Sequence, residues 1–194
     1  MKKVFIVHGF GGMPNGGWIP WLMQELAQKR VSACALSMPD SKEPVVSKWI
    51  EEIAHAVNNS LEDEIYLVGH SLGVPAILRY LESTSIDKKI SGVLLMSGFI
   101  SPLEPENKES NYRKIDSFVV PEIDFNKIKD KSDKFVVFHS IDDPAVPFSH
   151  GEKISIALNC ELVKTEKGGH FYILSEPICY KIPEVLSIME KILS

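Results

Sequence analysis

The first residue whose type and setting could do chemistry is Ser71, in the stretch VGHSLGVP at residues 68–75. It lies between Gly69 and Gly73, after a β-branched apolar run and before a run with helical spacing. Glycines two residues to either side relieve the crowding of a tight strand-to-helix turn, which raises the serine above the sheet. The stretch predicts a nucleophilic serine, with an ordinary glycine-rich connection as the alternative.

A serine hydroxyl is a weak nucleophile, so it needs a base, and the base needs an acid to orient it. Asp142 and Asp143 occur in HSIDDPAVP after an apolar run, and His170 follows two glycines in KGGHFY. The order serine, acid, histidine is expected when all three follow successive strands of one sheet. Spacing leaves the choice between the two acids nearly even. An alternative role for Asp142 is to hold the turn by accepting backbone amides.

The elements that must position these residues alternate along the chain. Short β-branched or aromatic runs, typical of strands buried on both faces, are separated by longer segments of helical period. This alternation predicts an α/β fold with about six parallel strands and helices on both faces, whose chemistry gathers where the strands end. The expected strands are residues 3–9, 31–37, 64–69, 90–98, 133–140 and 160–166, and helices are expected within 18–30, 44–59 and 180–193 and directly after Ser71.

The length of 194 residues predicts a single domain that covers residues 1–194. The one long irregular segment runs from Phe99 to about Asp124 and is rich in proline and charge. It predicts a solvated excursion that is too short to form a cap domain with its own core.

Composition excludes several classes of function. A net charge of −5 without a basic patch argues against binding to nucleic acid or to an anionic membrane. The apolar run Val4–Val7 is too short for a signal peptide, which needs about 7–15 apolar residues, or for a membrane span. Cys34, Cys160 and Cys179 lack CxxC spacing and suit a reducing compartment, so we expect a cytoplasmic protein. No metal-ligand pattern and no phosphate-binding glycine motif is present, and we expect neither metal nor cofactor.

The glycine-rich loop HGFGGMPNGGW follows the first expected strand. Its best use is as one wall of an oxyanion hole, through the backbone amide of Phe10 or of Gly11. The amide of Leu72, at the start of the helix after the serine, is the second expected donor. Trp18 is expected to anchor its helix in the core, with a place in an acyl pocket as the alternative.

Five other histidines are expected to be structural or solvated rather than catalytic. His8 should order the first loop, and His70 should pack beside the serine turn. His139, at the end of a strand, is a minor rival partner for the acid. His55 and His150 are expected on solvated helix surfaces.

Six motifs span nearly the whole chain: VHGFGG, GWIPWL, GHSLGVPAILRYLE, VLLMSGF, DDPAVPF and GGHF. With them the chain resembles the α/β-hydrolases and, more narrowly, the small retinoblastoma-binding-protein-9-like serine hydrolases, which include bacterial members. GWIPWL and DDPAVPF are the more specific of these motifs. The resemblance implies a triad of Ser71, Asp143 and His170, because the family's acid precedes an x-x-V-P turn. Retinoblastoma-pocket binding is not expected, since LxCxE is absent and LNCEL at residues 158–162 is the nearest string.

The leading hypothesis is a serine hydrolase that cleaves small to medium carboxylic esters or thioesters through an acyl-enzyme on Ser71. Its expected partner is a small-molecule acyl substrate. One alternative is a protein-interaction module on a hydrolase scaffold with little turnover, because a fold does not fix a function. Another is a serine peptidase or acyltransferase that uses the same triad.

Overall fold

A computed structural model describes residues 1–62, 64–83, 89–103, 111–171 and 180–194. Six parallel strands form one sheet in the order β2-β1-β3-β4-β5-β6, which confirms the predicted α/β sheet. The strands are β1 (Lys2–Val7), β2 (Ser32–Ala35), β3 (Glu64–His70), β4 (Gly92–Met96), β5 (Phe135–Ser140) and β6 (Glu161–Thr165).

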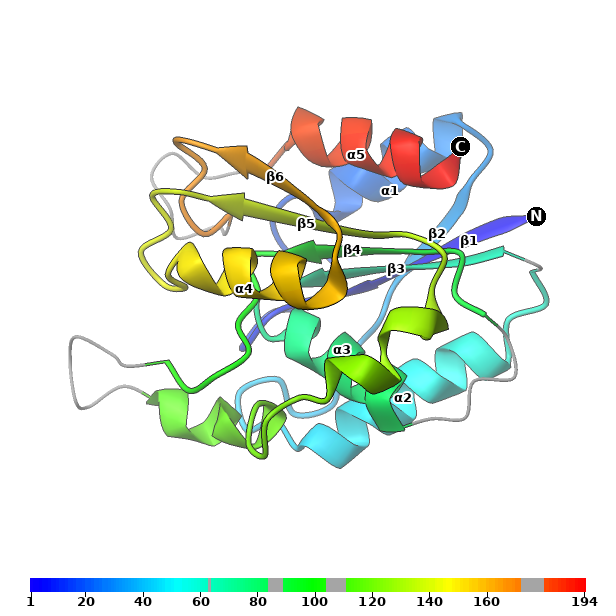
Figure 1. Ribbon diagram of the computed structural model, residues 1–194. Coiled ribbons are helices and arrows are strands. Elements are labelled where there is room, and N and C mark those ends of the chain that lie inside the picture. The colour runs from blue at the N-terminus through cyan, green and yellow to red at the C-terminus, as the bar shows by residue number, and fades with distance from the viewer. Residues whose placement is uncertain (63, 84–88, 104–110, 172–179) are drawn as a thin grey trace.

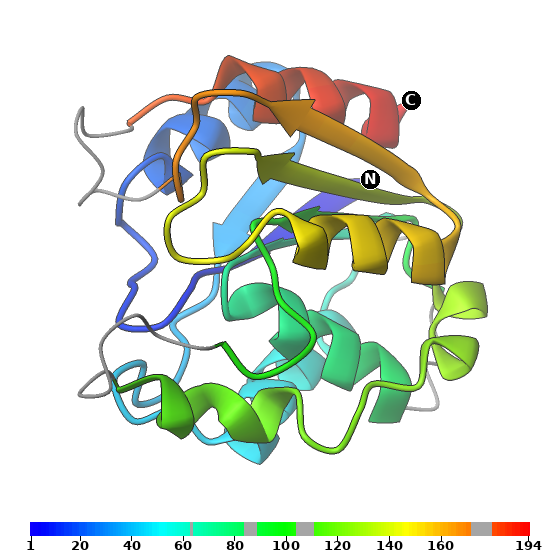
Figure 2. The same cartoon turned by 60° about the vertical axis from the view of Figure 1, so that its left-hand side comes forward.

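Helices cover both faces of this sheet, as parallel strands with right-handed crossovers require (Figures 1 and 2). One face carries α1 (Ile19–Gln28) and α5 (Pro183–Leu193). The other face carries α2 (Val46–Asn58), α3 (Gly73–Ser83) and α4 (Ser149–Leu158).

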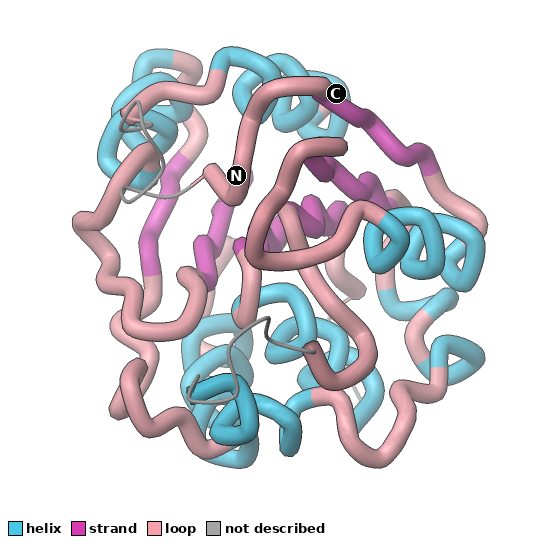
Figure 3. Tube along the Cα trace, turned by 90° about the vertical axis from the view of Figure 1, so that its left-hand side faces the viewer, coloured by secondary structure: helices cyan, strands magenta, loops and turns pink. Residues whose placement is uncertain are grey.

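The strand order reverses at β1, which pairs with β2 on one side and with β3 on the other. After β1 the chain passes to α1 on one face, whereas after β3 it passes to α3 on the opposite face. The two exits therefore diverge, and ligands of such sheets bind in the crevice between them. Figure 3 looks onto the edge of the sheet where the strands end and the connecting loops gather.

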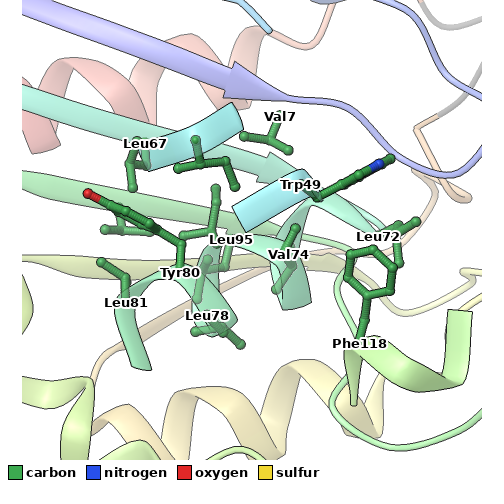
Figure 4. Close-up of a cluster of buried hydrophobic side chains, with 14 of the residues drawn as sticks. Val7, Trp49, Leu67, Leu72, Val74, Leu78, Tyr80, Leu81, Leu95 and Phe118 are labelled. Carbon is green, nitrogen blue, oxygen red and sulfur yellow. The ribbon is translucent and has the colours of Figure 1, made fainter. Parts of the chain in front are cut away.

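The larger core lies between the sheet and the three helices α2, α3 and α4 (Figure 4). Trp49 of α2 is fully buried, and its ring meets that of Phe118 edge to face at 5.4 Å. Leu72 and Val74, from the residues that follow the serine, belong to the same cluster. The start of α3 therefore packs against side chains from α2 and from the segment between β4 and β5.

The segment between β4 and β5 differs from its prediction. Its described part contains three 3-10 helices, at Asn111–Phe118, Phe125–Lys127 and Lys129–Lys131. Ile115, Phe118 and Val119 are buried, and the Arg79 guanidinium of α3 donates from Nε to the Phe118 carbonyl oxygen at 2.9 Å. The expectation of a solvated excursion is wrong for residues 113–124, because apolar side chains dispersed among the charges anchor this part to α3.

Cys34 and Cys160 are free and half-buried, while Cys179 lies outside the described residues. Among the residues that the structure describes, no helix is both long and apolar enough to cross a membrane.

Candidate active site

The turn at residues 69–73, here called the serine elbow, lifts Ser71 out of the end of β3. Ser71 has a φ of 54°, in the left-handed region that a non-glycine residue rarely adopts. Its N–H donates to the Met96 carbonyl oxygen of the neighbouring strand β4 at 2.9 Å. The backbone is therefore held in this conformation by the sheet itself.

Close backbone packing explains why glycines flank the serine. A Cβ added to Gly73 would lie 2.2 Å from the Val7 carbonyl oxygen at the end of β1. A Cβ added to Gly69 would lie 2.9 Å from both the Gly73 carbonyl oxygen and Ile77 Cδ1. These separations leave no room for a side chain, so the elbow packs against β1 and α3 only with glycine at both positions.

The structure brings Ser71, His170 and Asp143 together from the ends of three strands. Ser71 Oγ lies 2.9 Å from His170 Nε2, and His170 Nδ1 lies 2.9 Å from Asp143 Oδ2. Since a carboxylate only accepts, Nδ1 carries the ring proton and Nε2 is left to accept from the serine hydroxyl. The geometry favours Asp143 over Asp142 as the partner of the imidazole.

The Asp143 carboxylate is fully buried and well supplied with donors. Its Oδ1 accepts the backbone N–H groups of Ala145 and Val146, each at 2.9 Å. Burial by itself would raise the pKa of Asp143, but hydrogen bonds from His139, His170 and the Val146 amide outweigh it. The net pKa is held well below its usual range, so the acid stays ionised.

His139 is the second histidine beside Asp143, but it is not equivalent to His170. Its Nε2 lies 3.5 Å from Asp143 Oδ2 and donates to the Val146 carbonyl oxygen at 3.0 Å. His139 is completely buried, whereas the side chain of His170 is 17% exposed. His139 thus contacts Asp143 from the protein interior, and His170 contacts it on the side that faces Ser71.

Two backbone amides next to Ser71 remain free to bind a negative charge. Among the described residues, neither the N–H of Phe10 nor that of Leu72 has a hydrogen-bond acceptor. The N–H of Gly11 donates to the Ser41 carbonyl oxygen at 2.7 Å, which leaves Phe10 as the candidate in its loop. A Cβ on Gly9 would lie 2.9 Å from Ser71 Cβ, so this loop passes directly beside the serine.

Other predicted residues take structural places. His8 orders its loop: its Nδ1 lies 2.9 Å from the Gly9 carbonyl oxygen, and its Nε2 accepts the Met38 N–H at 3.4 Å. Burial lowers the pKa of His8, consistent with a neutral ring. Trp18 packs in the core at 2% exposure, as its first expectation required, and its place in an acyl pocket stays a prediction.

One histidine expectation is wrong. His55 is exposed as predicted, but His150 is buried at the start of α4, and its Nδ1 accepts the Ile100 N–H at 3.3 Å. Helical position alone did not reveal that the segment after β4 covers this side of the helix.

Asp142 and His70 contact the turn that carries His170, which the sequence analysis did not predict. Asp142 accepts the amides of Gly168 and Gly169, and His70 contacts the His170 carbonyl oxygen. The doubled acid in the sequence signalled a second carboxylate at this strand end, but not its partners in another loop.

A pocket of about 480 Å³ lies between the loops that follow β1 and β2, with His8, Met13, Met38 and Lys42 among its walls. Ser71 and His170 do not line it, so we assign it no part in the chemistry. Within the described ranges, no three His, Cys, Asp or Glu residues are arranged to hold a metal ion.

Comparison with known proteins decides the family. The sequence model of a family described as serine hydrolase matches residues 4–182. The chain belongs to the serine hydrolase family. It is 33% identical to the putative hydrolase YdeN of Bacillus subtilis over 185 residues, which cover 93% of this chain and 94% of that protein. It is also 27% identical to the serine hydrolase RBBP9 of Rattus norvegicus over 175 residues, 87% of each chain.

Solved structures agree with this assignment. The crystal structure of the ydeN gene product from B. subtilis superposes with a TM-score of 0.89 at 30% identity, covering 100% of this chain and 99% of that one. Est1E from Butyrivibrio proteoclasticus, with ferulic acid bound, gives a TM-score of 0.75 at 15% identity, covering 100% and 88% of the two chains. The predicted resemblance and the α/β-hydrolase fold are confirmed, and the chain is a serine hydrolase.

Proposed function

We propose that this serine hydrolase cleaves small to medium carboxylic esters or thioesters through an acyl-enzyme on Ser71. The observation that carries the proposal is the unbroken line of contacts from Ser71 Oγ to His170 Nε2 and from His170 Nδ1 to Asp143, at 2.9 Å each. A serine, a base that accepts its proton and an acid that orients the base are the parts that acyl transfer needs.

In the first step, the Ser71 hydroxyl proton passes to His170 Nε2 while Oγ attacks the carbonyl carbon of the substrate. The imidazolium that forms is stabilised by the buried carboxylate of Asp143, which stays ionised. The negative charge gathers on the former carbonyl oxygen. The free amides of Leu72 and Phe10 are our candidates to bind it, because donors fixed in advance stabilise charge that develops during the reaction.

In the second step, His170 Nε2–H gives its proton to the leaving alkoxide or thiolate, and the bond from the carbonyl carbon to that group breaks. The acyl group remains as an ester on Ser71 Oγ. Water then attacks this ester, His170 takes its proton, and the acid is released with Ser71 restored. Esters and thioesters are the substrates that this step favours, because an alkoxide or a thiolate is a better leaving group than the nitrogen of an amide.

Access to the site supports substrates of modest size without a large cap. The described part of the segment between β4 and β5 packs on α3, and the His170 side chain keeps 17% of its surface exposed. Ser71 follows the end of β3 and His170 follows the end of β6, and Figure 3 looks onto this edge of the sheet, where the loops gather.

A fluorophosphonate probe tests the nucleophile directly. It should label the native protein in one position, mapped by mass spectrometry to the peptide that contains Ser71, and should not label Ser71→Ala. Ser149→Ala, which alters a serine at the start of α4, is the matched control and should label like the native protein. Failure of the native protein to label would contradict the proposal and favour an interaction module.

A turnover series then tests the substrate class. p-Nitrophenyl esters of acyl chains from two to eight carbons, the matching thioesters and aminoacyl p-nitroanilides are assayed in parallel. Ester or thioester turnover that exceeds amide turnover is expected. Faster cleavage of the amides would replace the esterase proposal with a peptidase, and acyl transfer to an added alcohol or amine in preference to water would replace it with an acyltransferase.

A further inference from the structure

His170 lies on a short turn, residues 166–171, which we call the histidine turn. It follows β6, an edge strand whose residues are half-buried or exposed, and Gly169 and Phe171 both adopt positive φ values of 54°. Neither a buried strand nor a helix fixes this backbone, in contrast to the serine elbow. The position of the imidazole must therefore be set by contacts from other elements.

Asp142 holds the turn on the side that precedes His170. Its Oδ1 accepts the N–H of Gly169 at 2.8 Å and the N–H of Gly168 at 3.1 Å. The same oxygen accepts the Ser140 hydroxyl, whose Oγ accepts the Gly168 N–H at 2.8 Å. Because a carboxylate that accepts backbone amides makes strong, charge-assisted bonds, this side of the turn is tied to the end of β5.

The hydrogen bonds of the Asp142 carboxylate favour its ionised form, which suits it to this role. The Ser140 hydroxyl, with the amides of Gly169 and Gly168, lowers the pKa of Asp142. Asp142 makes no contact with the His170 ring, which faces Asp143 instead. The two neighbouring acids therefore divide the work: one binds the imidazole, and the other binds the backbone that carries it.

His70 holds the turn on the other side. Its Nε2 lies 2.8 Å from the carbonyl oxygen of His170 itself, and since a carbonyl only accepts, Nε2–H is the donor. His70 is buried beside the edge of Trp18 at 6.0 Å, and its ring centroid is 5.0 Å from that of His170. The residue directly before the nucleophile is thus bonded to the residue that would activate it.

We propose that Asp142 and His70 are positioning residues for His170, which hold its backbone from both sides and so set the distance from His170 Nε2 to Ser71 Oγ. The proposal rests on the proposed function, because a set distance matters only if His170 takes the serine proton. A misplacement of about 1 Å costs on the order of a hundredfold in rate even when it originates far from the reacting atoms. The hydrogen bonds of both residues end on the backbone of the histidine turn, so each acts on the chemistry through His170.

The test measures four proteins: native, Asp142→Ala, Asp142→Asn and Glu166→Ala. Each is assayed for kcat and KM on p-nitrophenyl acetate and for its second-order rate of fluorophosphonate labelling. Asp142→Ala should lower kcat and the labelling rate by about 10- to 100-fold with little change in KM. Asp142→Asn should recover most of the rate, because its amide oxygen can accept the same backbone N–H groups.

Glu166→Ala is the matched control, since it removes one carboxylate from the same turn at an exposed position. It should keep the native kcat, which separates the hydrogen bonds of Asp142 from a general effect of charge. A kcat for Asp142→Ala within twofold of native, in a preparation whose native protein labels, would overturn this inference and leave the proposed function intact. A parallel fall in Asp142→Asn and Asp142→Ala would also overturn it.

His70→Phe, alone and combined with Asp142→Ala, tests whether His70 and Asp142 hold the same backbone. His70→Phe keeps a ring of similar size but removes the donor to the His170 carbonyl oxygen. If both residues hold one backbone, the double variant with Asp142→Ala should lose less than the product of the two single losses. Losses that multiply would show two independent effects and contradict a shared hold.

A proton resonance makes the inference testable even if no turnover is found. In the native protein the Nδ1 proton of His170, bonded to Asp143, should give a downfield NMR signal that is absent from Asp143→Ala. This signal should broaden or vanish in Asp142→Ala, while the other amide signals of the β-sheet stay in place. An unchanged signal would refute the positioning role, whatever the native protein does with esters.

Discussion

The serine elbow and the histidine turn bring two halves of one site together by different means. The elbow lies between central strands, and its glycines touch backbone atoms of β1 and α3. The histidine turn lies beyond an edge strand, and its backbone is held by the side chains of Asp142 and His70. The elbow is positioned by steric packing of its backbone, whereas the histidine turn depends on hydrogen bonds together with the burial of Phe171 against Phe138.

This difference predicts which changes each half tolerates. A close-packed interior transmits any added volume, so an elbow variant should lose stability before it loses its chemistry. A turn held by hydrogen bonds can be loosened without unfolding, so its variants should lose rate first. The four predictions below test this division, beginning with the largest expected effect.

Asp143→Asn should lower kcat by about 10⁴-fold. The asparagine oxygen can still accept the amides of Ala145 and Val146, but its NH₂ would donate to His170 Nδ1. The ring proton would then sit on Nε2, which faces Ser71 Oγ. A protonated Nε2 cannot accept the hydroxyl proton. Steady-state kinetics on p-nitrophenyl acetate, with urea denaturation alongside, measures both consequences.

Asp142→Asn makes the same chemical change one residue earlier and serves as the control. It should cost less than about tenfold in kcat, because only backbone amides depend on this side chain. Equal losses at the two positions would show that the acids are interchangeable, and would remove the division of work between them.

Gly73→Ala should destabilise the fold by about 3 kcal/mol or more, because its methyl carbon would lie 2.2 Å from the Val7 carbonyl oxygen. Neither backbone can yield easily, since Val7 is paired in the sheet. Urea denaturation of the purified variant, or its loss from the soluble fraction, measures this effect. A destabilisation below about 1 kcal/mol would show that the elbow is not sterically fixed.

The stability of the molecule should fall as the pH is lowered from about 6.5 toward 3. Burial, followed by the charge of His170, lowers the pKa of His70 to about 3 in the folded protein. Between these pH values the unfolded chain binds a proton at His70 that the folded chain refuses, so folding loses up to about 1.4 kcal/mol per pH unit. Burial also lowers the pKa of His8 and of His150, which adds to the slope in the same direction.

His70→Phe isolates the share of this slope that belongs to one histidine. The free energy of unfolding is measured by urea titration between pH 7 and pH 5 for native and variant proteins. The variant should show a shallower slope, whatever its absolute stability. Identical slopes would mean that the pKa of His70 is the same in the folded protein as in the unfolded chain.

The fold was predictable because its signals are local. A continuous apolar run predicts each buried strand. The motif GHSLG predicts the elbow because both of its glycines lie within five consecutive residues. The order of the strands is not local, and neither is the cover over His150. Apolar residues such as Ile115 and Phe118, spread among charges, concealed the packing of their segment on α3.

The same distinction explains what was missed in the site. Ser71 and His170 follow from motif and order, whereas the choice of Asp143 needed either a family resemblance or the folded structure. The bonds of Asp142 and His70 to the histidine turn end on backbone groups 26 to 100 residues away. Backbone N–H and C=O groups are the same at almost every position, so residue types in the sequence do not predict which of these groups a side chain will bind.

The smallest predicted effect compares two glycines that are required for different reasons. Gly169 has a φ of 54°, so alanine there should cost about 1 kcal/mol of stability from backbone strain. Asparagine tolerates this left-handed region, and Gly169→Asn should therefore recover part of the loss. At Gly73 the obstacle is the Val7 carbonyl oxygen, so Gly73→Asn should be no better than Gly73→Ala. Thermal unfolding of the four variants measures these differences, and rescue by asparagine at residue 73 would contradict the steric account of the elbow.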